Sequence, residues 1–274
     1  MTRIPRGHPR YASLITRARL SAASRTGLVV PEGLIAHGRG EAFDYFLGET
    51  TSPSARRAIR AAAVWLHHAV HPVVSVNGNV AALAAPQIAR LVRAYPRLAV
   101  EVNLFHRTPG RARAVAQKLT AAGVRQVLGV HPTARLEGLG SDRAKIDARG
   151  IARADVCLIP LEDGDRTEAL RAAGKRVIAI DLNPLSRTAQ QADIPIIDEL
   201  TRALGELTRA AGRVRGPPGG ARFPAFDRDA ALRSATQAMV RRLTHSRPTR
   251  PPPALGAFRR PARGTGRPSR RRTG

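Results

Sequence analysis

Several residue types are scarce in this sequence, and each shortage excludes a class of protein. The one cysteine, Cys157, cannot form an internal disulfide, and no group of cysteines and histidines has the spacing of a zinc site. Aromatic residues make up only 4% of the chain, so aliphatic side chains must fill the core. No apolar run approaches the roughly 18 residues that span a membrane. We therefore expect a cytoplasmic protein without a membrane partner, in which Cys157 is a buried, inert thiol.

Familiar catalytic patterns are missing as well. The chain has neither a Walker A loop nor the Gly-x-Gly-x-x-Gly pattern of dinucleotide-binding turns. It also lacks a Gly-x-Ser-x-Gly elbow, which disfavours covalent hydrolysis.

Positive charge, in contrast, is abundant and unevenly placed. The chain has 46 lysines and arginines against 20 acidic residues, a net charge of +26, and only three of the basic residues are lysines. Residues 213–274 hold sixteen arginines and two acids. Such a segment can bind RNA, DNA or another anionic surface electrostatically. The alternative is a solvated appendage whose deletion leaves activity nearly intact.

Between residues 71 and 212, short β-branched runs alternate with helix-like stretches. The runs predict strands at Val73–Val76, Leu98–Asn103, Gln126–Val130, Val156–Leu161, Val177–Leu182 and Ile194–Ile197. The stretches predict helices at Pro86–Ala94, Pro109–Ala122, Arg143–Ala152, Asp165–Ala173 and Glu199–Ala211. Strands that are apolar on both faces and separated by helices indicate a parallel sheet covered on both sides, a Rossmann-like α/β fold.

The segments on either side of this core have a different character. Residues 1–70 predict a helical region, with helices at Tyr11–Ala23 and Ala55–His68, a capped start at Ser52, and a tight loop at His37–Glu41. After residue 212 the pattern predicts a linker, a basic helix at Asp227–Leu243 and disorder from His245. We expect residues 1–212 to form one domain and residues 213–274 to be a largely disordered extension.

Two polar turns follow predicted strands, where parallel sheets bind their ligands. The turn Asn77-Gly78-Asn79 opens a helix and can meet an anion, although many such turns have no ligand. The turn Glu162–Asp165 brings carboxylates around a glycine, as a Mg²⁺ site would. Alternatively, Asp165 is a helix N-cap and Glu168 completes a capping box.

A third turn, Asp181–Thr188, follows the fifth strand. An acid at this point is placed to bind ribose hydroxyls, while Asn183 can pair with a base edge or simply make an Asn-Pro turn. Arg39 lies between two glycines and suits a phosphate or a carboxylate. His37 can exchange protons near neutral pH or be structural, and Asn103 can cap a helix or bind substrate.

Taken together, these blocks resemble the archaeal 4-phosphopantoate–β-alanine ligase family, also called phosphopantothenate synthetases. The matching segments occur in the family's order and cover most of residues 4–212: His8–Tyr11, Leu34–Tyr45, His71–Leu83, Glu101–Phe105, Pro160–Leu170 and Val177–Thr188. The resemblance implies a homodimer that binds ATP and 4-phosphopantoate. The family activates the pantoate carboxylate as an acyl-adenylate, releases pyrophosphate, and lets the amine of β-alanine displace AMP.

The resemblance also implies roles for individual residues. It places ATP contacts at Arg17, Arg39, Asp181, Leu182, Asn183, Arg187, Thr188, Glu199 and Leu200. The family usually has asparagine where this chain has Glu199. We expect Asn77, Asn79 and Asn103 to orient phosphopantoate, His37 to accept a proton from β-alanine, and Asp163 or Asp165 to contact Mg²⁺. Two other classes remain open: a Rossmann-type nucleotide-binding enzyme of different chemistry, and a nucleic-acid-binding protein acting through its tail.

Overall fold

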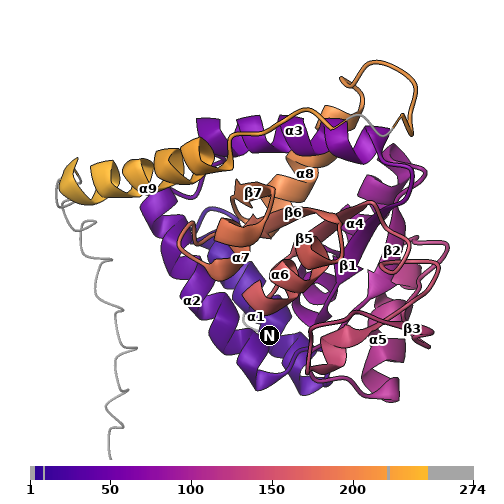
Figure 1. Ribbon diagram of the computed structural model, residues 1–274. Coiled ribbons are helices and arrows are strands. Elements are labelled where there is room, and N and C mark those ends of the chain that lie inside the picture. The colour runs from indigo at the N-terminus through magenta and orange to yellow at the C-terminus, as the bar shows by residue number, and fades with distance from the viewer. Residues whose placement is uncertain (1–3, 9, 221–222, 246–274) are drawn as a thin grey trace, which may run out of the picture.

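A computed structural model describes residues 4–8, 10–220 and 223–245 of the chain. Its centre is a parallel five-stranded sheet in the order β2-β1-β5-β6-β7 (Figure 1). The strands are β1 (Pro72–Val76), β2 (Ala99–Val102), β5 (Val156–Pro160), β6 (Arg176–Asp181) and β7 (Ile194–Ile197). Val74 of β1 pairs with Val100 on one side and with Leu158 on the other. The Rossmann-like α/β fold predicted from the sequence is confirmed.

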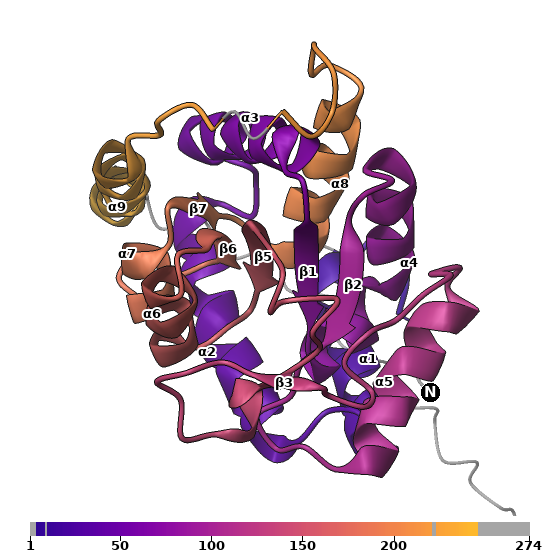
Figure 2. The same ribbon diagram turned by 45° about the vertical axis from the view of Figure 1, so that its right-hand side comes forward.

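Helices precede, cover and follow the sheet (Figures 1 and 2). Three come before the first strand: α1 (Tyr11–Arg25), α2 (Pro31–Leu47) and α3 (Pro53–His68). The others are α4 (Gly78–Ala94), α5 (Pro109–Ala121), α6 (Gly164–Ala172), α7 (Arg187–Gln191), α8 (Leu200–Ala211) and α9 (Arg228–His245). Among the described helices, none is long and apolar enough to cross a membrane.

The core lies on both faces of the sheet because successive strand residues point in opposite directions. Ile178 and Ile180 of β6 pack with side chains of α3, α4, α5 and α8. Val177 and Ala179 of the same strand pack on the other face with α6 and the loop region before β5. Cys157 belongs to this second cluster; it is a free, buried thiol, and burial raises its pKa to about 12. The expectation that it is buried is confirmed, and the raised pKa is consistent with an unreactive thiol.

Local signals account for several helix starts. The Ser52 hydroxyl accepts a hydrogen bond from the Ala55 amide (3.1 Å), which confirms the predicted cap of α3. In α4, Asn77 caps the helix in the same way, so α4 begins eight residues before the predicted Pro86. The helix tolerates this proline because Ala84 leaves helical geometry (φ −132°, ψ 15°).

Two predicted elements between β2 and β5 were wrong. Residues 126–130 form no strand, only an isolated bridge between Leu128 and Glu101. Residues 143–152 form no helix; a 3₁₀ turn (Asp142–Ala144) leads into β4 (Lys145–Ile146), which pairs antiparallel with β3 (Ala134–Arg135). The buried carboxylate of Glu101 explains the second error, because it accepts the Asp147 and Ile151 amides that a helix would have satisfied internally.

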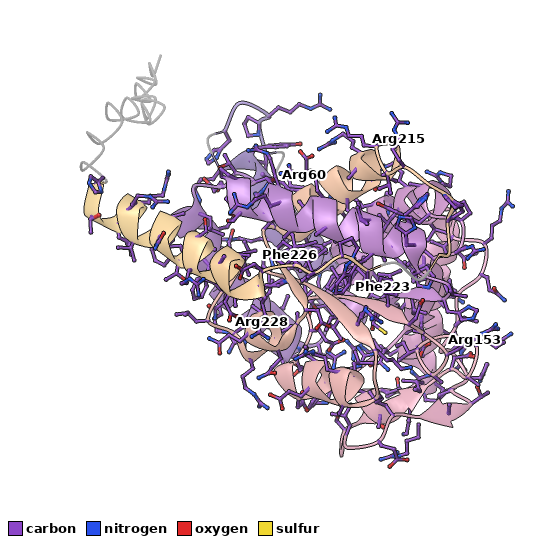
Figure 3. The ribbon with its side chains drawn as sticks, turned by 45° about the horizontal axis from the view of Figure 1, so that its top comes forward. Arg60, Arg153, Arg215, Phe223, Phe226 and Arg228 are labelled. Carbon is purple, nitrogen blue, oxygen red and sulfur yellow. The ribbon has the colours of Figure 1, made fainter. Side chains whose placement is uncertain are left out.

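The segment after α8 returns along α3 and ends in α9 (Figure 3). Phe223 packs edge-on against Trp65 of α3 (5.7 Å between ring centroids), and Arg176 stacks on its other side. In α9, Ala235 and Met239 are buried against α2 and β7. The basic helix predicted at Asp227–Leu243 is therefore confirmed and is packed on the body. Residues 246–274 lie outside the described residues, and their expected disorder stays a prediction.

Candidate functional site

The carboxyl ends of the five strands meet along one edge of the sheet. The strand order reverses between β1 and β5, and ligands of open α/β sheets bind at such a reversal. The polar turns after β1, β5 and β6 all lie at this edge. It is therefore the candidate site.

Helix α2 runs along this edge and reaches the ends of both β1 and β6. Near its start, the Gly33 carbonyl accepts a hydrogen bond from Asn79 Nδ2 (2.7 Å) in the turn after β1. Six residues on, Arg39 acts electrostatically on Asp181, the last residue of β6. Six helical residues span roughly 9 Å, close to the roughly 10 Å across the two strand spacings between β1 and β6. A single helix thus links the two polar turns.

The predicted tight loop at His37–Glu41 was wrong, because these residues lie in the middle of α2. A glycine costs about 0.5–1 kcal/mol in a helix interior, and the flanking apolar residues Leu34, Phe43 and Leu47 outweigh it by packing on the core. No atom lies within 4 Å of where a Cβ of Gly38 or Gly40 would stand. The backbone on both sides of Arg39 is therefore open, and its side chain is carried by a helix.

Asp181 is held in place from within its own turn. Its Oδ1 accepts the Asn183 amide (2.9 Å) and its Oδ2 accepts the Ser186 hydroxyl (2.5 Å). Burial raises the pKa of this carboxyl, and the Arg39 guanidinium opposes the rise. A carboxylate has about four acceptor sites, more than these hydrogen bonds use, so it can still accept a hydroxyl group from a ligand.

Arg187 and Thr188 begin α7 immediately beyond this turn. Arg187 is exposed and pairs with Glu168 of α6 (2.9 Å). Thr188 is buried, and its hydroxyl donates to the Glu162 carbonyl (2.7 Å). Gly164 is the residue that lets α6 come this close, because a Cβ there would collide with Arg187. The turns after β5 and β6 are consequently fixed against each other.

Arg17, Glu41 and His37 form a cluster between α1 and α2. Arg17 donates two hydrogen bonds to Glu41 (2.9 and 2.7 Å) and Ser13 donates a third (2.5 Å). Burial opposes these bonds, but they hold the pKa of Glu41 below its usual value. Arg17 is therefore paired with a carboxylate in this structure, and that ion pair must break before Arg17 can bind a phosphate.

His37 belongs to this cluster and is also within electrostatic reach of Glu199, which follows β7. Burial lowers the pKa of its imidazole, and Glu41 and Glu199 oppose that shift by their charge. Its Nε2 is buried and has no hydrogen-bond partner among the described residues. The ring is consequently neutral at pH 7 and has a nitrogen available for a proton.

Glu199 and Leu200 follow β7 at the start of α8. Glu199 is the N-cap of α8, and its side chain accepts the Thr201 and Arg202 amides. Leu200 is buried in the core, so only its backbone can face a ligand. An asparagine at position 199 could cap the helix equally well, which accounts for the difference from the family in structural terms.

The three asparagines expected to orient phosphopantoate are all tied to the protein. Asn77 caps α4 and donates to the Leu161 carbonyl (2.8 Å), which joins the ends of β1 and β5. Asn103 is fully buried and donates to two carbonyls, those of Arg143 and Lys145 (3.1 Å each). With Asn79 bound to Gly33, each amide positions a backbone segment around the site. Direct contact with substrate stays a prediction.

Arginine side chains already pair with two of the carboxylates in the acidic turn after β5. Arg143 contacts Glu162 (2.6 Å) and Asp163 (2.8 Å), and the fully buried Arg166 pairs with Glu162. The N-cap of α6 is Asp163, so the alternative prediction of Asp165 as cap was wrong. Within the described ranges, no group of three or more acidic, histidine or cysteine residues is placed to hold a metal ion.

Sequence reasoning missed residues that the fold brings to this edge. Asp44, Arg202 and Asp198 form a chain of ion pairs that fastens α2 to the start of α8. Arg111 of α5 reaches the first turn of α4, where its Nη2 stands 2.8 Å from the position of a Cβ on Gly78. Neither contact has a local sequence signal, because the partners come from distant segments.

Comparison with known proteins gives one consistent answer. Residues 54–242 match the model of the family described as phosphopantothenate/pantothenate synthetase. The match extends through most of α9, which the sequence had placed in an extension outside the resemblance.

Several curated relatives carry the name 4-phosphopantoate–β-alanine ligase. The chain is 56% identical to the protein of Methanospirillum hungatei over 201 residues, 73% of this chain and 82% of the relative. It is 52% identical to the protein of Thermococcus onnurineus over 204 residues (74% and 78%) and 52% identical to that of Methanosarcina mazei over 205 residues (75% and 80%).

Proposed function

The chain belongs to the phosphopantothenate/pantothenate synthetase family, and we propose from this premise that it joins 4-phosphopantoate to β-alanine at the expense of ATP. The product is 4′-phosphopantothenate, an intermediate of coenzyme A biosynthesis. The observation that carries the proposal within this chain is that the charge of Arg39 acts on the buried carboxyl of Asp181. It supports one site in which a cation and a ribose acceptor meet the same nucleotide.

In the first step, a carboxylate oxygen of phosphopantoate attacks the α-phosphorus of ATP. The bond to the β-phosphate breaks, pyrophosphate leaves, and an acyl-adenylate forms. Two anions must approach each other, so cations at this point lower the barrier. We assign this role to Arg39, supported by Arg17 and Arg187. The Arg187 pair with Glu168 is exposed and weak enough to be exchanged for phosphate, and Arg17 is itself about half exposed in its pair with Glu41.

The nucleoside is assigned to the turn after β6. Asp181 accepts the ribose hydroxyls, and Asn183 pairs with the base; Leu182, Thr188, Glu199 and Leu200 complete the pocket. Internal hydrogen bonds to Asp181 keep its carboxylate in position before ATP arrives, which reduces the entropy lost on binding.

In the second step, the amine of β-alanine attacks the acyl carbon. The C–N bond forms, the bond to the adenylate oxygen breaks, and AMP leaves with the electron pair. The amine must first lose a proton, and the neutral, unpartnered Nε2 of His37 is suited to accept it. Asn77, Asn79 and Asn103 are assigned to positioning phosphopantoate.

Magnesium is the metal that fits this chemistry. It binds few protein carboxylates and takes its remaining ligands from phosphates and water. Asp165 is exposed and Asp163 is about half exposed, and both lie at the start of α6, near the start of α7. This pair can therefore supply such carboxylates. Bound there, the metal would offset phosphate charge. Arg143 already holds Asp163, which leaves Asp165 as the freer of the two.

We also propose a cytoplasmic homodimer. Large apolar side chains are exposed on α2, in the turn before α7 and on α9, among them Ile35 (72%), Leu185 (64%) and Leu243 (60%). A second copy would cover such a surface. Sedimentation at micromolar concentration should give twice the mass of the chain, and a monomer would refute the assembly without touching the activity.

The decisive assay for the activity is AMP release by purified protein. AMP and pyrophosphate should form only when 4-phosphopantoate, β-alanine and ATP are all present. ADP as the nucleotide product, or turnover without β-alanine, would refute the proposal. Nucleic-acid binding through residues 246–274 is a second candidate, favoured only by charge; it requires salt-sensitive binding that disappears when those residues are removed.

A further inference from the structure

Arg111 is a half-buried cation at the carboxyl edge of the sheet with no acidic partner. Its Nε donates to the Leu28 carbonyl (3.3 Å) and its Nη1 to the His106 carbonyl (2.6 Å). No carboxylate of the described chain lies within 4 Å of it, in contrast to Arg17, Arg143 and Arg187. The two carbonyls fix the orientation of the guanidinium, and Nη2 has no acceptor among the residues that the structure describes.

The guanidinium stands over the first turn of α4. Its Nη2 lies 2.8 Å from where a Cβ of Gly78 would be, and that Cβ would also collide with the Leu28 carbonyl. Only glycine permits this approach. The amides of Gly78 and Asn79 are at the free end of a seventeen-residue helix, and Asn77 caps the next amide, that of Val80. The Arg111 guanidinium therefore lies close to the first turn of α4, where helix amides lack intrahelical acceptors.

The charges around this point also favour an anion. Burial lowers the pKa of Arg111, and the charge of Arg143 lowers it further, while the exposed Glu32 acts in the opposite sense. Arg143 is itself fastened to Glu162 and Asp163. Two guanidinium groups held near each other repel, and a bound anion relieves that repulsion.

We propose that Arg111 and the first-turn amides of α4 bind the phosphate of 4-phosphopantoate, and that this contact makes the enzyme select a phosphorylated acid. The inference rests on the proposed ligase function. It adds a substrate-binding residue that neither the sequence motifs nor the family resemblance had singled out.

The position of Arg111 agrees with the way in which 4-phosphopantoate must lie along the edge of the sheet. Helix α2 connects this turn, through Asn79 and Gly33, with Arg39 beside Asp181. The separation between the turns after β1 and β6 is roughly 10 Å. With its phosphate at Arg111, a short acid extends along the edge and presents its carboxylate to the α-phosphate of ATP near Arg39.

A phosphate at this point could belong to the acid or to the terminal phosphates of ATP, and kinetics separate the two. Arg111→Ala should lower kcat/KM for 4-phosphopantoate by about 100-fold, the usual cost of losing a buried charged contact. The KM for ATP should change less than about threefold. The kcat/KM for unphosphorylated pantoate, which we expect to be low in the wild type, should be nearly unchanged in the variant. Inorganic phosphate should compete with 4-phosphopantoate in the wild type and no longer do so in the variant.

Two further variants control for folding. Arg113→Ala, on the exposed face of the same helix, should behave as the wild type. Arg111→Lys keeps the charge but loses the fixed fork, so it should recover part of the phosphopantoate affinity. The inference is overturned if Arg111→Ala prefers 4-phosphopantoate over pantoate as strongly as the wild type does. It is also overturned if the substitution raises only the KM for ATP. Absence of AMP release by the wild-type enzyme refutes the ligase function instead.

Discussion

Arg39 of α2 and Asp181 at the end of β6 come from different halves of the chain, and the charge of one acts on the carboxyl of the other. Burial alone would disfavour ionisation of Asp181. Arg39, the Asn183 amide and the Ser186 hydroxyl counteract that burial. The proposed nucleotide site therefore depends on α2 being held near the strand ends, and the predictions below probe that arrangement.

Arg39→Ala should reduce kcat/KM for AMP release by about 100-fold or more, as expected when a donor to a developing charge is lost. Arg39 is exposed and has no ion pair in the described chain, so the melting temperature should not change. Arg56→Ala, an exposed arginine on α3 outside the candidate site, is the matched control. Kinetics equal to those of the control would remove Arg39 from the site.

The pH profile should report His37. Its pKa is lowered below 6.5, chiefly by burial, and the neutral ring is the form that accepts a proton. The turnover rate should therefore be at its maximum above pH 6.5, and it should fall only as the pH drops through the lowered pKa of His37. His37→Gln should lose this acidic limb together with most of kcat. An unaltered limb in the variant would assign the titration to another group.

Arg202 should matter for stability more than for chemistry. It bridges Asp44 of α2 and the buried Asp198, which also accepts the Thr51 hydroxyl. Arg202→Met leaves both carboxylates without their cation, and breaking a buried ion pair costs about 3–5 kcal/mol. Urea unfolding should show a loss of this size. Arg209→Met, which removes only an exposed pair with Glu206, should cost less than about 1 kcal/mol.

Two truncations should separate the packed helix from the arginine-rich tail. Ending the chain at His245 should leave the melting temperature and turnover close to those of the full chain. Ending it at residue 222 removes Phe223 from Trp65 and exposes the surface that Ala235 and Met239 cover. The melting temperature should then fall by about 5 °C or more. Equal stability of the two proteins would show that α9 contributes nothing.

The sheet was predictable because its strands carry their own signal. Val73–Val76 and Ile194–Ile197 are short β-branched runs, and such residues pack well on a sheet buried on both faces. The polar turns at the strand ends could be found for the same reason, since each follows a run that the sequence defines.

Elements whose conformation depends on distant partners could not be predicted. Gly38 and Gly40 resemble a loop, yet packing of the rest of α2 keeps them helical. Residues 143–152 have helical composition, yet Glu101 captures their amides. Arg111 stands in an ordinary arginine- and alanine-rich helix, and only the absence of a side chain at Gly78 brings it to the site.

Helix α2 is hydrogen-bonded to the turn after β1 through Gly33, and through Arg39 it acts electrostatically on the turn after β6. A ligand that displaces α2 at one of these turns must also change the position of α2 at the other turn. If ATP and phosphopantoate bind at these two turns as proposed, their dissociation constants are linked, and each substrate changes the affinity for its companion by an identical factor.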